Sequence, residues 1–482
     1  MASISSIGVG ANLDLGALLT QLQTAENQPL VALKAKQTSY NSKLSAYGTL
    51  QSALTGIQAA AKRLGDPALF QAITGTPSVS GILAASGTDP RSVGTYAIDI
   101  SQLAQAQSVI AKGQASTTAA IGSGKITIDF GKVSGGTLDP ATGQYTGATF
   151  DKDATRTAKP ITIDATNNTL GGIRDAINAA NAGVSATIVN DGSGTPNRLV
   201  LTSTQTGEAS AMRISVDGDA ALQNLLGNDP AGTQNLKQTA AAQNAKLTVN
   251  NIAVTSTSNS VTDAIQGTTL TLVQTGKLSL VMKANTTSVK TAITDFVKAY
   301  NALQSTAKSL TAFDTDAKAA APLVGDSTLR NLQTRIRQAL VAPQVGGPND
   351  LKVLTSIGIS FQKDGTLAID NDKLDKAIDT NLEGVAKLFS SGTGSTAGYG
   401  KQLTALVDDL TGTKGALKVA TDGVTSSLKQ LDTQYTAMKE RADATVERYR
   451  KQFVQLDVAM NKMNGTLKYL AQQFDAMNAS KG

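Results

Sequence analysis

The sequence contains no cysteine, no histidine and no tryptophan, and aromatic residues make up only 4% of its 482 positions. These absences exclude disulfides, the usual zinc ligands, cysteine nucleophiles and every general base built on histidine. Paired carboxylates, lysine or serine would remain for an enzyme, but no catalytic motif appears along the chain. We therefore predict a protein that is not an enzyme, with no catalytic residues, no cofactor and no metal site.

Long apolar runs are also missing. No stretch reaches about 18 uninterrupted apolar residues, the length that a membrane-spanning helix needs, so we expect no membrane span. The first residues, MASISSIGVGANLDLGALL, have no basic segment followed by an apolar run, so we expect no Sec signal peptide. The formal net charge of +6 is spread over the whole chain, which favours an ordinary soluble surface and no nucleic-acid partner.

The sequence does contain a long heptad pattern near its C-terminal end. Between residues 446 and 477 the apolar side chains recur in alternating steps of three and four. Burying each large apolar side chain contributes roughly 1.5–3 kcal/mol, and a helix left in water would forgo that energy. We therefore predict that this stripe contacts a partner. The predicted contact residues are Val446, Tyr449, Phe453, Leu456, Met460, Met463, Leu467, Leu470 and Phe474.

The N-terminal end carries a matching pattern between residues 30 and 64. A shorter helix precedes it, with Asp14 as its N-cap, and Pro29 limits how far that helix runs without a kink. One extra step of three around Gly48 predicts a local overwinding or a break. The two ends together predict a coiled-coil stalk, although packing as an ordinary core within one monomer remains the alternative. The predicted N-terminal contact residues are Leu15, Leu18, Leu22, Leu33, Tyr40 and Leu44.

The middle of the chain has a different pattern, in which β-branched residues alternate with polar ones between turn residues. One helix interrupts it, capped by Thr169, and the 3.6-residue period of a helix returns at residue 287. The KDG sequence between two apolar runs predicts a hairpin near residues 359–370. The predicted strands are 95–104, 125–130, 160–164, 185–190, 198–203, 246–256, 268–276 and 277–285.

Several motifs, which follow one another along the chain as they do in the family, resemble the flagellar hook-associated protein 2 family. The stretch IGVGANLDLGALLTQLQTAENQPL is similar to the family's Gly-rich turn and Asp-led helix, with Gly10, Ala11 and Asn12 where the family usually has Gly-Ser-Gly. The stretch around Ile177 and Asn178 resembles the IN motif of flagellins and hook proteins. Further similar segments are GTYAIDISQLAQAQSV, AITDFVKAYNAL, PLVGDSTLRNLQTRIRQAL, LTSIGISFQKDGTLAIDNDKL and YRKQFVQLDVAMNKM.

The resemblance implies a secreted, extracellular protein at the tip of the bacterial flagellar filament, exported unfolded through the flagellar type III apparatus. It implies a homo-oligomeric ring, a pentamer or a similar assembly, with β-rich heads in a plate and helical legs pointing at the filament. Such a cap promotes the folding and insertion of exported flagellin during filament elongation, and in some bacteria it is also an adhesin. The implied partners are flagellin, hook-filament junction proteins, an export chaperone and host glycans or mucin.

These observations predict an α+β multidomain fold with a coiled-coil leg, a helical or mixed middle domain and inserted β-rich heads. Two alternatives remain: another axial flagellar protein (a hook-filament junction protein or flagellin), and a carbohydrate-binding surface adhesin or a hydrolase. The predicted hairpin favours the cap over other axial proteins. The predicted domains are 1–46 (N-terminal leg), 47–67 with 286–423 (middle), 68–112 with 244–285 (head), 113–243 (inserted head with the IN motif) and 424–482 (C-terminal leg).

Overall fold

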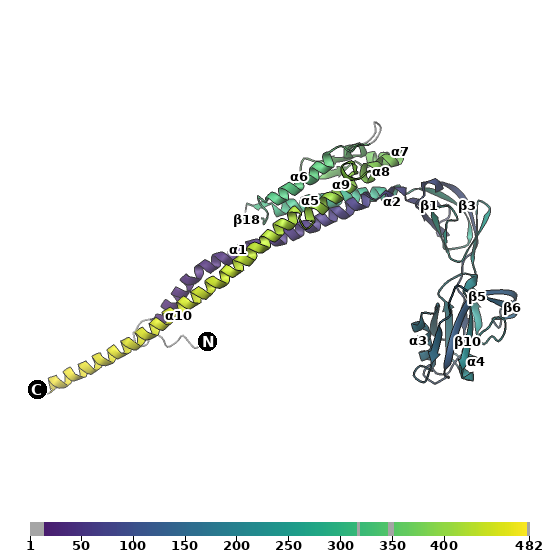
Figure 1. Ribbon diagram of the computed structural model, residues 1–482, viewed down its shortest axis with the longest axis horizontal. Coiled ribbons are helices and arrows are strands. Elements are labelled where there is room, and N and C mark those ends of the chain that lie inside the picture. Colours follow the sequence, from purple (N-terminus) through teal and green to yellow (C-terminus); the bar gives the residue numbers. More distant parts are fainter. Residues whose placement is uncertain (1–13, 316–318, 346–350, 480–482) are drawn as a thin grey trace. The chain divides into compact units, whose positions relative to one another are not determined.

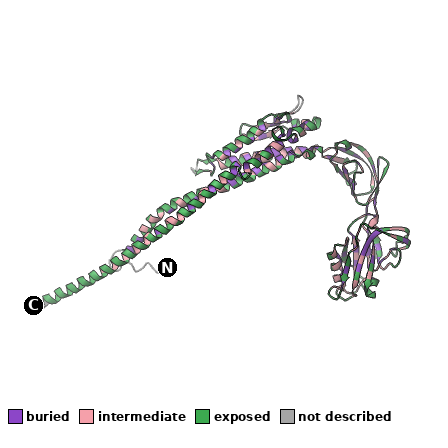
Figure 2. Cartoon of the chain, in the orientation of Figure 1, coloured by how far each residue is buried: buried purple, intermediate pink, exposed green. Residues whose placement is uncertain are grey.

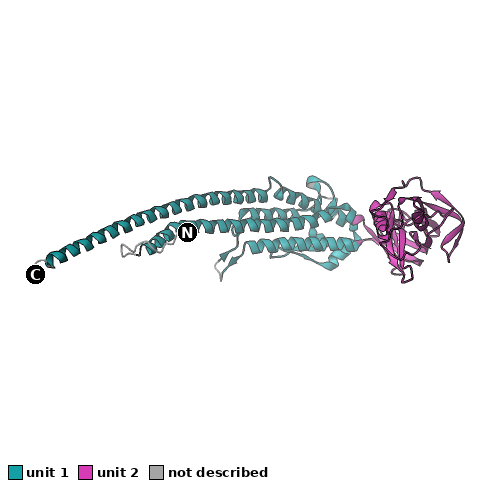
Figure 3. Cartoon of the chain, turned by 90° about the horizontal axis from the view of Figure 1, so that it is seen from below, with its two compact units in different colours: residues 1–69, 286–482 teal, residues 70–285 magenta. Residues whose placement is uncertain are grey.

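The computed structural model describes residues 14–315, 319–345 and 351–479. The chain forms two compact units, one made of Met1–Leu69 with Thr286–Gly482 and the other of Phe70–Asn285 (Figure 3). The predicted α+β fold class is confirmed, because long helices stand at both ends of the chain and strands dominate its middle. Residues 7–13 of the N-terminal motif lie outside the described residues.

The first unit is organised around two long helices, α1 (Leu15–Leu64) and α10 (Ala416–Ala479). They lie side by side and run in opposite directions (Figure 1). Apolar residues repeat every three to four positions in both sequences, which places them along one face of each helix. The repeat positions of α1 are buried or half-buried: Leu30, Leu33, Gln37, Tyr40, Leu44, Tyr47, Leu50, Leu54, Ile57, Ala61 and Leu64.

The prediction of two separate N-terminal helices is wrong, because α1 is one helix that contains both Pro29 and Gly48. Asp14 caps its start as predicted, and the Asp14 carboxylate accepts a hydrogen bond of 2.9 Å from the Ala17 amide. A proline in a helix costs about 3 kcal/mol and a glycine about 1 kcal/mol relative to alanine. The contacts of α1 with α10 along its length offset these costs.

The second half of α1 also contacts α5 (Thr286–Leu310) and α9 (Tyr399–Thr411), and its apolar face is fully buried there. The predicted hairpin is confirmed, since β19 (Ile359–Phe361) pairs antiparallel with β20 (Leu367–Ile369). The other helical and strand segments around this unit are α2 (Pro67–Gln71), β17 (Phe313–Asp314), β18 (Ala319–Ala320), α6 (Ser327–Val341), η4 (Leu354–Ile357), α7 (Asn371–Thr380), α8 (Leu382–Ser390) and η5 (Gly394–Thr396).

A buried carboxylate links α1 to the start of α6. Asp326 is the N-cap of α6, and its Oδ1 accepts a hydrogen bond of 3.0 Å from the Leu329 amide. Its Oδ2 accepts one of 2.6 Å from the Tyr47 hydroxyl and forms an ion pair of 2.9 Å with the Lys43 ammonium. Burial alone would raise the pKa of Asp326, but these three donors hold that pKa below its ordinary value. The carboxylate is therefore charged in the folded protein at neutral pH.

Replacing this carboxylate should destabilise the first unit measurably. We expect Asp326→Ala to cost about 2–4 kcal/mol, because a helix cap is lost and the buried Tyr47 hydroxyl loses its partner. Because the folded pKa is lowered, the contribution is present above the unfolded value of about 3.9 and is lost as pH falls through the lower folded pKa. Urea unfolding followed by helical circular dichroism at pH 7 and pH 3 would measure both effects. An equal loss of stability at both pH values would contradict the assigned charge.

The second unit begins and ends in one eight-stranded sheet. The strand β1 (Ile73–Pro77) pairs with β16 (Gly276–Ala284), so the two ends of this unit lie next to each other. The sheet has the order β13-β12-β3-β16-β1-β2-β15-β14 and is antiparallel throughout. The remaining strands of this sheet are β2 (Leu83–Gly87), β3 (Gly94–Gln102), β12 (Ala245–Val249), β13 (Ile252–Ser256), β14 (Ser260–Thr262) and β15 (Thr268–Leu272), with η2 (Pro90–Ser92) before β3.

Two smaller sheets lie in the part of the chain between β3 and β12. One has the order β10-β5-β6 with β7 paired to β5, and the other has the order β11-β4-β9-β8. Their strands and helices share one hydrophobic core, separate from that of the eight-stranded sheet. The elements are β4 (Ser108–Ile110), β5 (Gly124–Asp139), β6 (Gln144–Lys152), β7 (Pro160–Ile163), α3 (Leu170–Ala180), β8 (Val184–Asn190), β9 (Asn197–Ser203), η3 (Glu208–Ser210), β10 (Ala211–Gly218), α4 (Ala220–Leu226) and β11 (Lys237–Ala240).

Every segment that the alternation predicted contains a strand of the structure, but the predicted strand 246–256 is wrong, because Asn250 and Asn251 turn the chain and divide it into β12 and β13, and the predicted strand 268–276 ends at Leu272. The Thr169 hydroxyl caps α3 by accepting a hydrogen bond from the Gly172 amide. The alternation missed β1, β2, β4, β10, β11 and β14, and it also missed β6 and the second half of β5, which pair as a long hairpin. This hairpin holds Gly135, Gly136 and Gly147 at φ of 65°, 71° and 71°. Glycine is the residue that adopts this left-handed backbone without strain, and it contributes no apolar side chain to an alternating pattern.

The finer division of the chain into five segments stays a proposal, and the two separate cores of the second unit support it. We expect the isolated segment Phe70–Asn285 to fold by itself, because its two ends pair in one sheet and its cores are complete. Its circular dichroism spectrum should be dominated by β-structure, with cooperative thermal unfolding. A largely helical spectrum, or no unfolding transition, would contradict this division.

Candidate interaction surface

The last part of α10 extends beyond the helix that covers the rest of it. Leu30 and Lys34 of α1 line a groove together with Tyr435 and Lys439 of α10, which fixes the register of the pair. Both helices rise about 1.5 Å per residue, so the start of α1 lies opposite about residue 455 of α10. The helix α10 continues to Ala479, about 24 residues or about 36 Å further. This end of α10 therefore has no contact with α1.

The predicted contact residues fall into two groups, divided near this point. Those inside the α1–α10 pair are mostly covered, and those beyond it are mostly exposed, as the green end of α10 in Figure 2 shows. Leu15 is buried; Leu22, Leu33, Tyr40, Leu44, Val446, Tyr449, Phe453 and Met460 are half-buried; and Leu18, Leu456, Met463, Leu467, Leu470 and Phe474 are exposed.

We call the set Leu456, Met460, Met463, Leu467, Leu470 and Phe474 the C-terminal stripe. At about 100° per residue these side chains lie within one narrow sector of α10. Leu467 is 56% exposed and Phe474 61%, which is unusual for large apolar side chains. Covering them would contribute roughly 1.5–3 kcal/mol each, less the cost of ordering the partner. Such a stripe fits a groove between other helices, or a single apolar helix.

Sequence analysis missed further exposed apolar residues at this end of α10. Val454, Val458 and Tyr469 are also exposed, by 44%, 50% and 61%, and lie on the opposite side of α10 from the C-terminal stripe. At the other end of the pair, Leu19 is buried while Leu18 is exposed. Leu19 lies eleven residues before the buried Leu30, three helical turns, and this phase relation is a signal that the sequence already contains.

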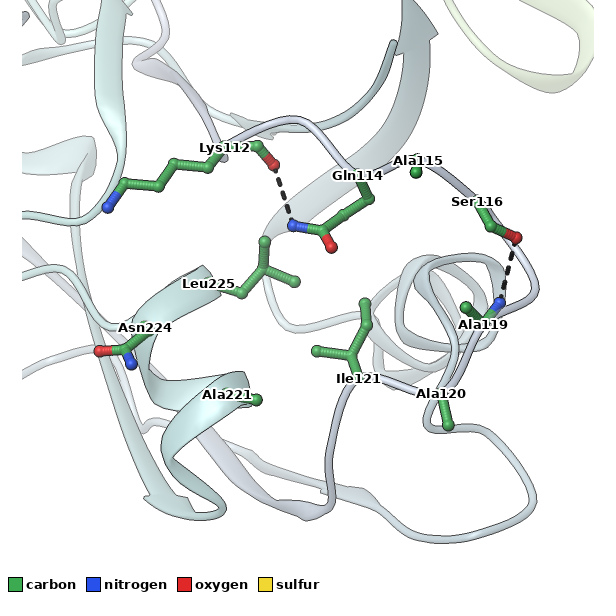
Figure 4. Close-up of a pocket in the computed structure, with 10 residues that line it drawn as sticks. All are labelled: Lys112, Gln114, Ala115, Ser116, Ala119, Ala120, Ile121, Ala221, Asn224 and Leu225. Carbon is green, nitrogen blue, oxygen red and sulfur yellow. Dashed lines mark hydrogen bonds between the residues drawn. The ribbon is translucent and has the colours of Figure 1, made fainter. Parts of the chain in front are cut away.

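The second unit carries a cavity of about 450 Å³, drawn in Figure 4. Lys112, Gln114 and Asn224 surround an apolar floor made by Ile121 and Leu225 (Figure 4). The Gln114 side chain donates a hydrogen bond of 3.5 Å to the Lys112 carbonyl, within the same segment. No aromatic ring lines this cavity, so it offers no flat surface on which a sugar ring would stack.

The described residues contain no group of three acidic side chains that could hold a metal ion. In the same part of the chain, no helix is both long and apolar enough to span a membrane. What the C-terminal stripe offers is a row of exposed apolar side chains on one helix face.

Three protein-family models match parts of the chain. They are the flagellar hook-associated protein 2 N-terminus over residues 11–107, the flagellar hook-associated protein 2 C-terminus over residues 242–465, and the flagellin hook IN motif over residues 146–205. The last of these contains Ile177 and Asn178, on which the predicted resemblance to the IN motif was based.

Whole proteins match along their full length. The chain is 40% identical over 498 residues to the flagellar hook-associated protein 2 of Escherichia coli K12, covering 100% of both chains. It is 36% identical over 493 residues to the protein of the same name from Salmonella typhimurium, again covering 100% of both chains. The B-type flagellar hook-associated protein 2 of Pseudomonas aeruginosa is 32% identical, with 100% of this chain and 99% of that protein covered.

One solved structure matches both units in fold. It is the crystal structure of the flagellar cap protein FliD D1-D2-D3 domains from Escherichia coli, with a TM-score of 0.60 and 37% sequence identity. The match covers 78% of this chain and 99% of that chain.

Proposed function

The chain belongs to the flagellar hook-associated protein 2 family, and from this premise we propose that it caps the growing flagellar filament as a homo-oligomeric ring. One observation carries the proposal: the C-terminal stripe extends past α1 and meets no partner among the described residues. The proposed ring stands at the extracellular tip of the filament and holds this helix against the filament below. Hook-filament junction proteins are the proposed partners before the first flagellin arrives.

The proposed mechanism is assisted folding of flagellin. An exported flagellin chain exposes apolar surface until it packs, and exposed apolar surface leads to aggregation. A ring of caps would retain the arriving chain while its helices pack against the other exposed apolar side chains of this end of α10, such as Val454, Val458 and Tyr469, and against flagellin already in place. This requires association and release, but no covalent chemistry, and it is consistent with a chain without cysteine or histidine.

An export chaperone is a further proposed partner. Before export, the exposed side chains of Leu467, Leu470 and Phe474 would face the cell interior, where a contiguous apolar patch promotes unwanted association. A chaperone that covers α10 would prevent this. The absence of cysteine fits export as an unfolded chain, because no disulfide can form before folding is complete.

Rings should be visible directly if this proposal is right. We expect negative-stain images of the purified full-length chain to show closed rings, with a matching large species in sedimentation velocity. Closed rings follow from a heterologous contact whose rotation closes. Monomers alone, at every concentration that can be measured, would contradict the ring and leave family membership unaffected.

Adhesion to host glycans or mucin is a second proposed function. The cavity beside Lys112 and Asn224 supports it with an ammonium and an amide at its rim. The lack of an aromatic ring in the cavity weakens it, so glycan-array binding of the chain, compared with Lys112→Ala and Asn224→Ala variants, is needed to test it.

A further inference from the structure

A groove on the first unit is lined in part by apolar side chains, as the C-terminal stripe is. It has a volume of about 600 Å³ and lies between α1 and α10. Leu30, Val31 and Ala35 contribute apolar side chains to its lining, and Lys34, Lys439 and Asp443 contribute charged ones. Val31 is 69% exposed, although two long helices meet beside it. A pair of helices leaves such a groove open until a third helix packs into it.

The stripe and the groove belong to the same chain but cannot meet within it. Val31 lies at the level of Lys439, and Leu470 is about 31 residues further along one continuous helix. At 1.5 Å per residue this separates the two by about 46 Å. A straight α-helix cannot fold back over that distance, so only another molecule can bring a C-terminal stripe to this groove.

The lengths and charges of the two surfaces also agree. The groove follows α1 from Gln23 to Thr38, about 22 Å, and the stripe from Met463 to Phe474 spans about 16 Å. Lys34 at the rim pairs with no carboxylate among the described residues, and neither does Asp475 beside Phe474 pair with a cation there. Lys439 at the same rim already forms an ion pair of 2.6 Å with Asp443, so Lys34 is the cation that Asp475 faces when the stripe enters the groove.

We propose that the C-terminal stripe of one copy packs into the α1–α10 groove of a neighbouring copy. The contact is heterologous, since each copy offers its stripe to one neighbour and its groove to the other, which is the type of contact that closes into a ring. This inference rests on the proposed ring and adds which surfaces form it. It assigns Val31 and the stripe to one interface between copies.

The chain offers a clean test, because it contains no cysteine. One full-length variant carries Val31→Cys and a longer affinity tag; the other carries Met463→Cys, Leu467→Cys, Leu470→Cys or Phe474→Cys, one at a time. The two proteins are mixed and oxidised, and the disulfide-linked heterodimer is identified by its size. We expect linkage at positions of the stripe, with yields at least tenfold above those of a Gln455→Cys or Gln473→Cys partner, which lie about 100° away on α10.

Three results would overturn the proposed contact. The first is equal linkage of Val31→Cys to the stripe and to the two glutamine positions. The second is linkage of a stripe variant only to itself, which would show that stripes pair with stripes. The third is the absence of a disulfide-linked heterodimer from every stripe variant.

The same variants separate this proposal from the proposed function. Under reducing conditions, each is tested for filament growth in cells that lack their own cap. Growth without cross-linking between copies would refute the groove contact while the cap function stands. Cross-linked rings from a chain that supports no filament would support the contact and refute the cap.

Discussion

A chain that ends at residue 451 should fold and yet support no filament. The truncation removes the whole C-terminal stripe and leaves the part of α10 that covers α1 up to residue 451, so that Phe453, half-buried in the helix pair, is the one predicted contact residue outside the stripe that is lost with it. Each of the six lost side chains would contribute roughly 1.5–3 kcal/mol to a contact outside the chain, so no partial contact of comparable strength remains. We expect cells that produce this variant to release flagellin into the medium and to carry hooks without filaments. Electron microscopy of the cells and flagellin in the culture supernatant would measure this.

A shorter truncation provides the control. Removing residues 478–482 leaves every residue of the C-terminal stripe in place, and we expect filaments of normal length. The second unit should be unchanged in both truncated chains, because its cores contain no residue after Asn285. Filaments of normal length from the chain that ends at residue 451 would refute the role of the stripe.

The helical part of the fold could largely be predicted from the sequence. Heptad spacing is a local property, and it identified the buried face of α1 from Leu30 to Leu64 before any contact was known. Caps are local too, which is why Asp14 and Thr169 could be predicted as the N-caps of their helices. The continuity of α1 through Pro29 and Gly48 could not be predicted, because it depends on packing against α10, a helix far away in the sequence.

The sheets could be predicted only as separate strands. Alternation indicates that residues 95–104 form a strand, but it does not indicate which strands lie on either side of it. The pairing of β1 with β16 joins residues about 210 positions apart, and no periodic pattern encodes such a partner. The link from Tyr47 to Asp326 is similar, since 279 positions separate a tyrosine in a heptad from an aspartate at a helix cap.

The candidate surface lies between these two cases. Its residues could be predicted from the heptad spacing. The position along α10 at which they become exposed could not, because it depends on the register of α1 against α10. That register depends on how the two helices pair in space. For this reason the heptad pattern predicted a contact for both Tyr449 and Leu470, whereas in the structure Tyr449 is half-buried and Leu470 is exposed.

Two charges placed in the C-terminal stripe should abolish its contacts without unfolding the chain. Leu467 and Leu470 are 56% and 44% exposed, so Leu467→Glu with Leu470→Glu should change the free energy of unfolding by no more than about 0.5 kcal/mol per site. Leucine and glutamate also have similar helix propensities. In a contact that buries both sites, the loss of apolar transfer energy alone is roughly 3–6 kcal/mol. This corresponds to an affinity at least about 100-fold weaker, and we expect no filaments and no rings.

The matched control is Gln455→Glu with Gln473→Glu. It adds the same two negative charges to the same helix, at exposed positions about 100° from the centre of the C-terminal stripe. We expect cells that produce this control to swim. We expect the purified control to form rings and to unfold at the same temperature as the unmodified chain. Motility, negative-stain images and thermal unfolding of the two double variants therefore separate the effect of added charge from the effect of its position.

If both pairs abolish filaments, added charge alone is the cause; if neither does, the stripe remains in water and its apolar pattern has no partner. If only the leucine pair loses filaments, and its thermal unfolding is unchanged, the C-terminal stripe is the contact that filament growth requires.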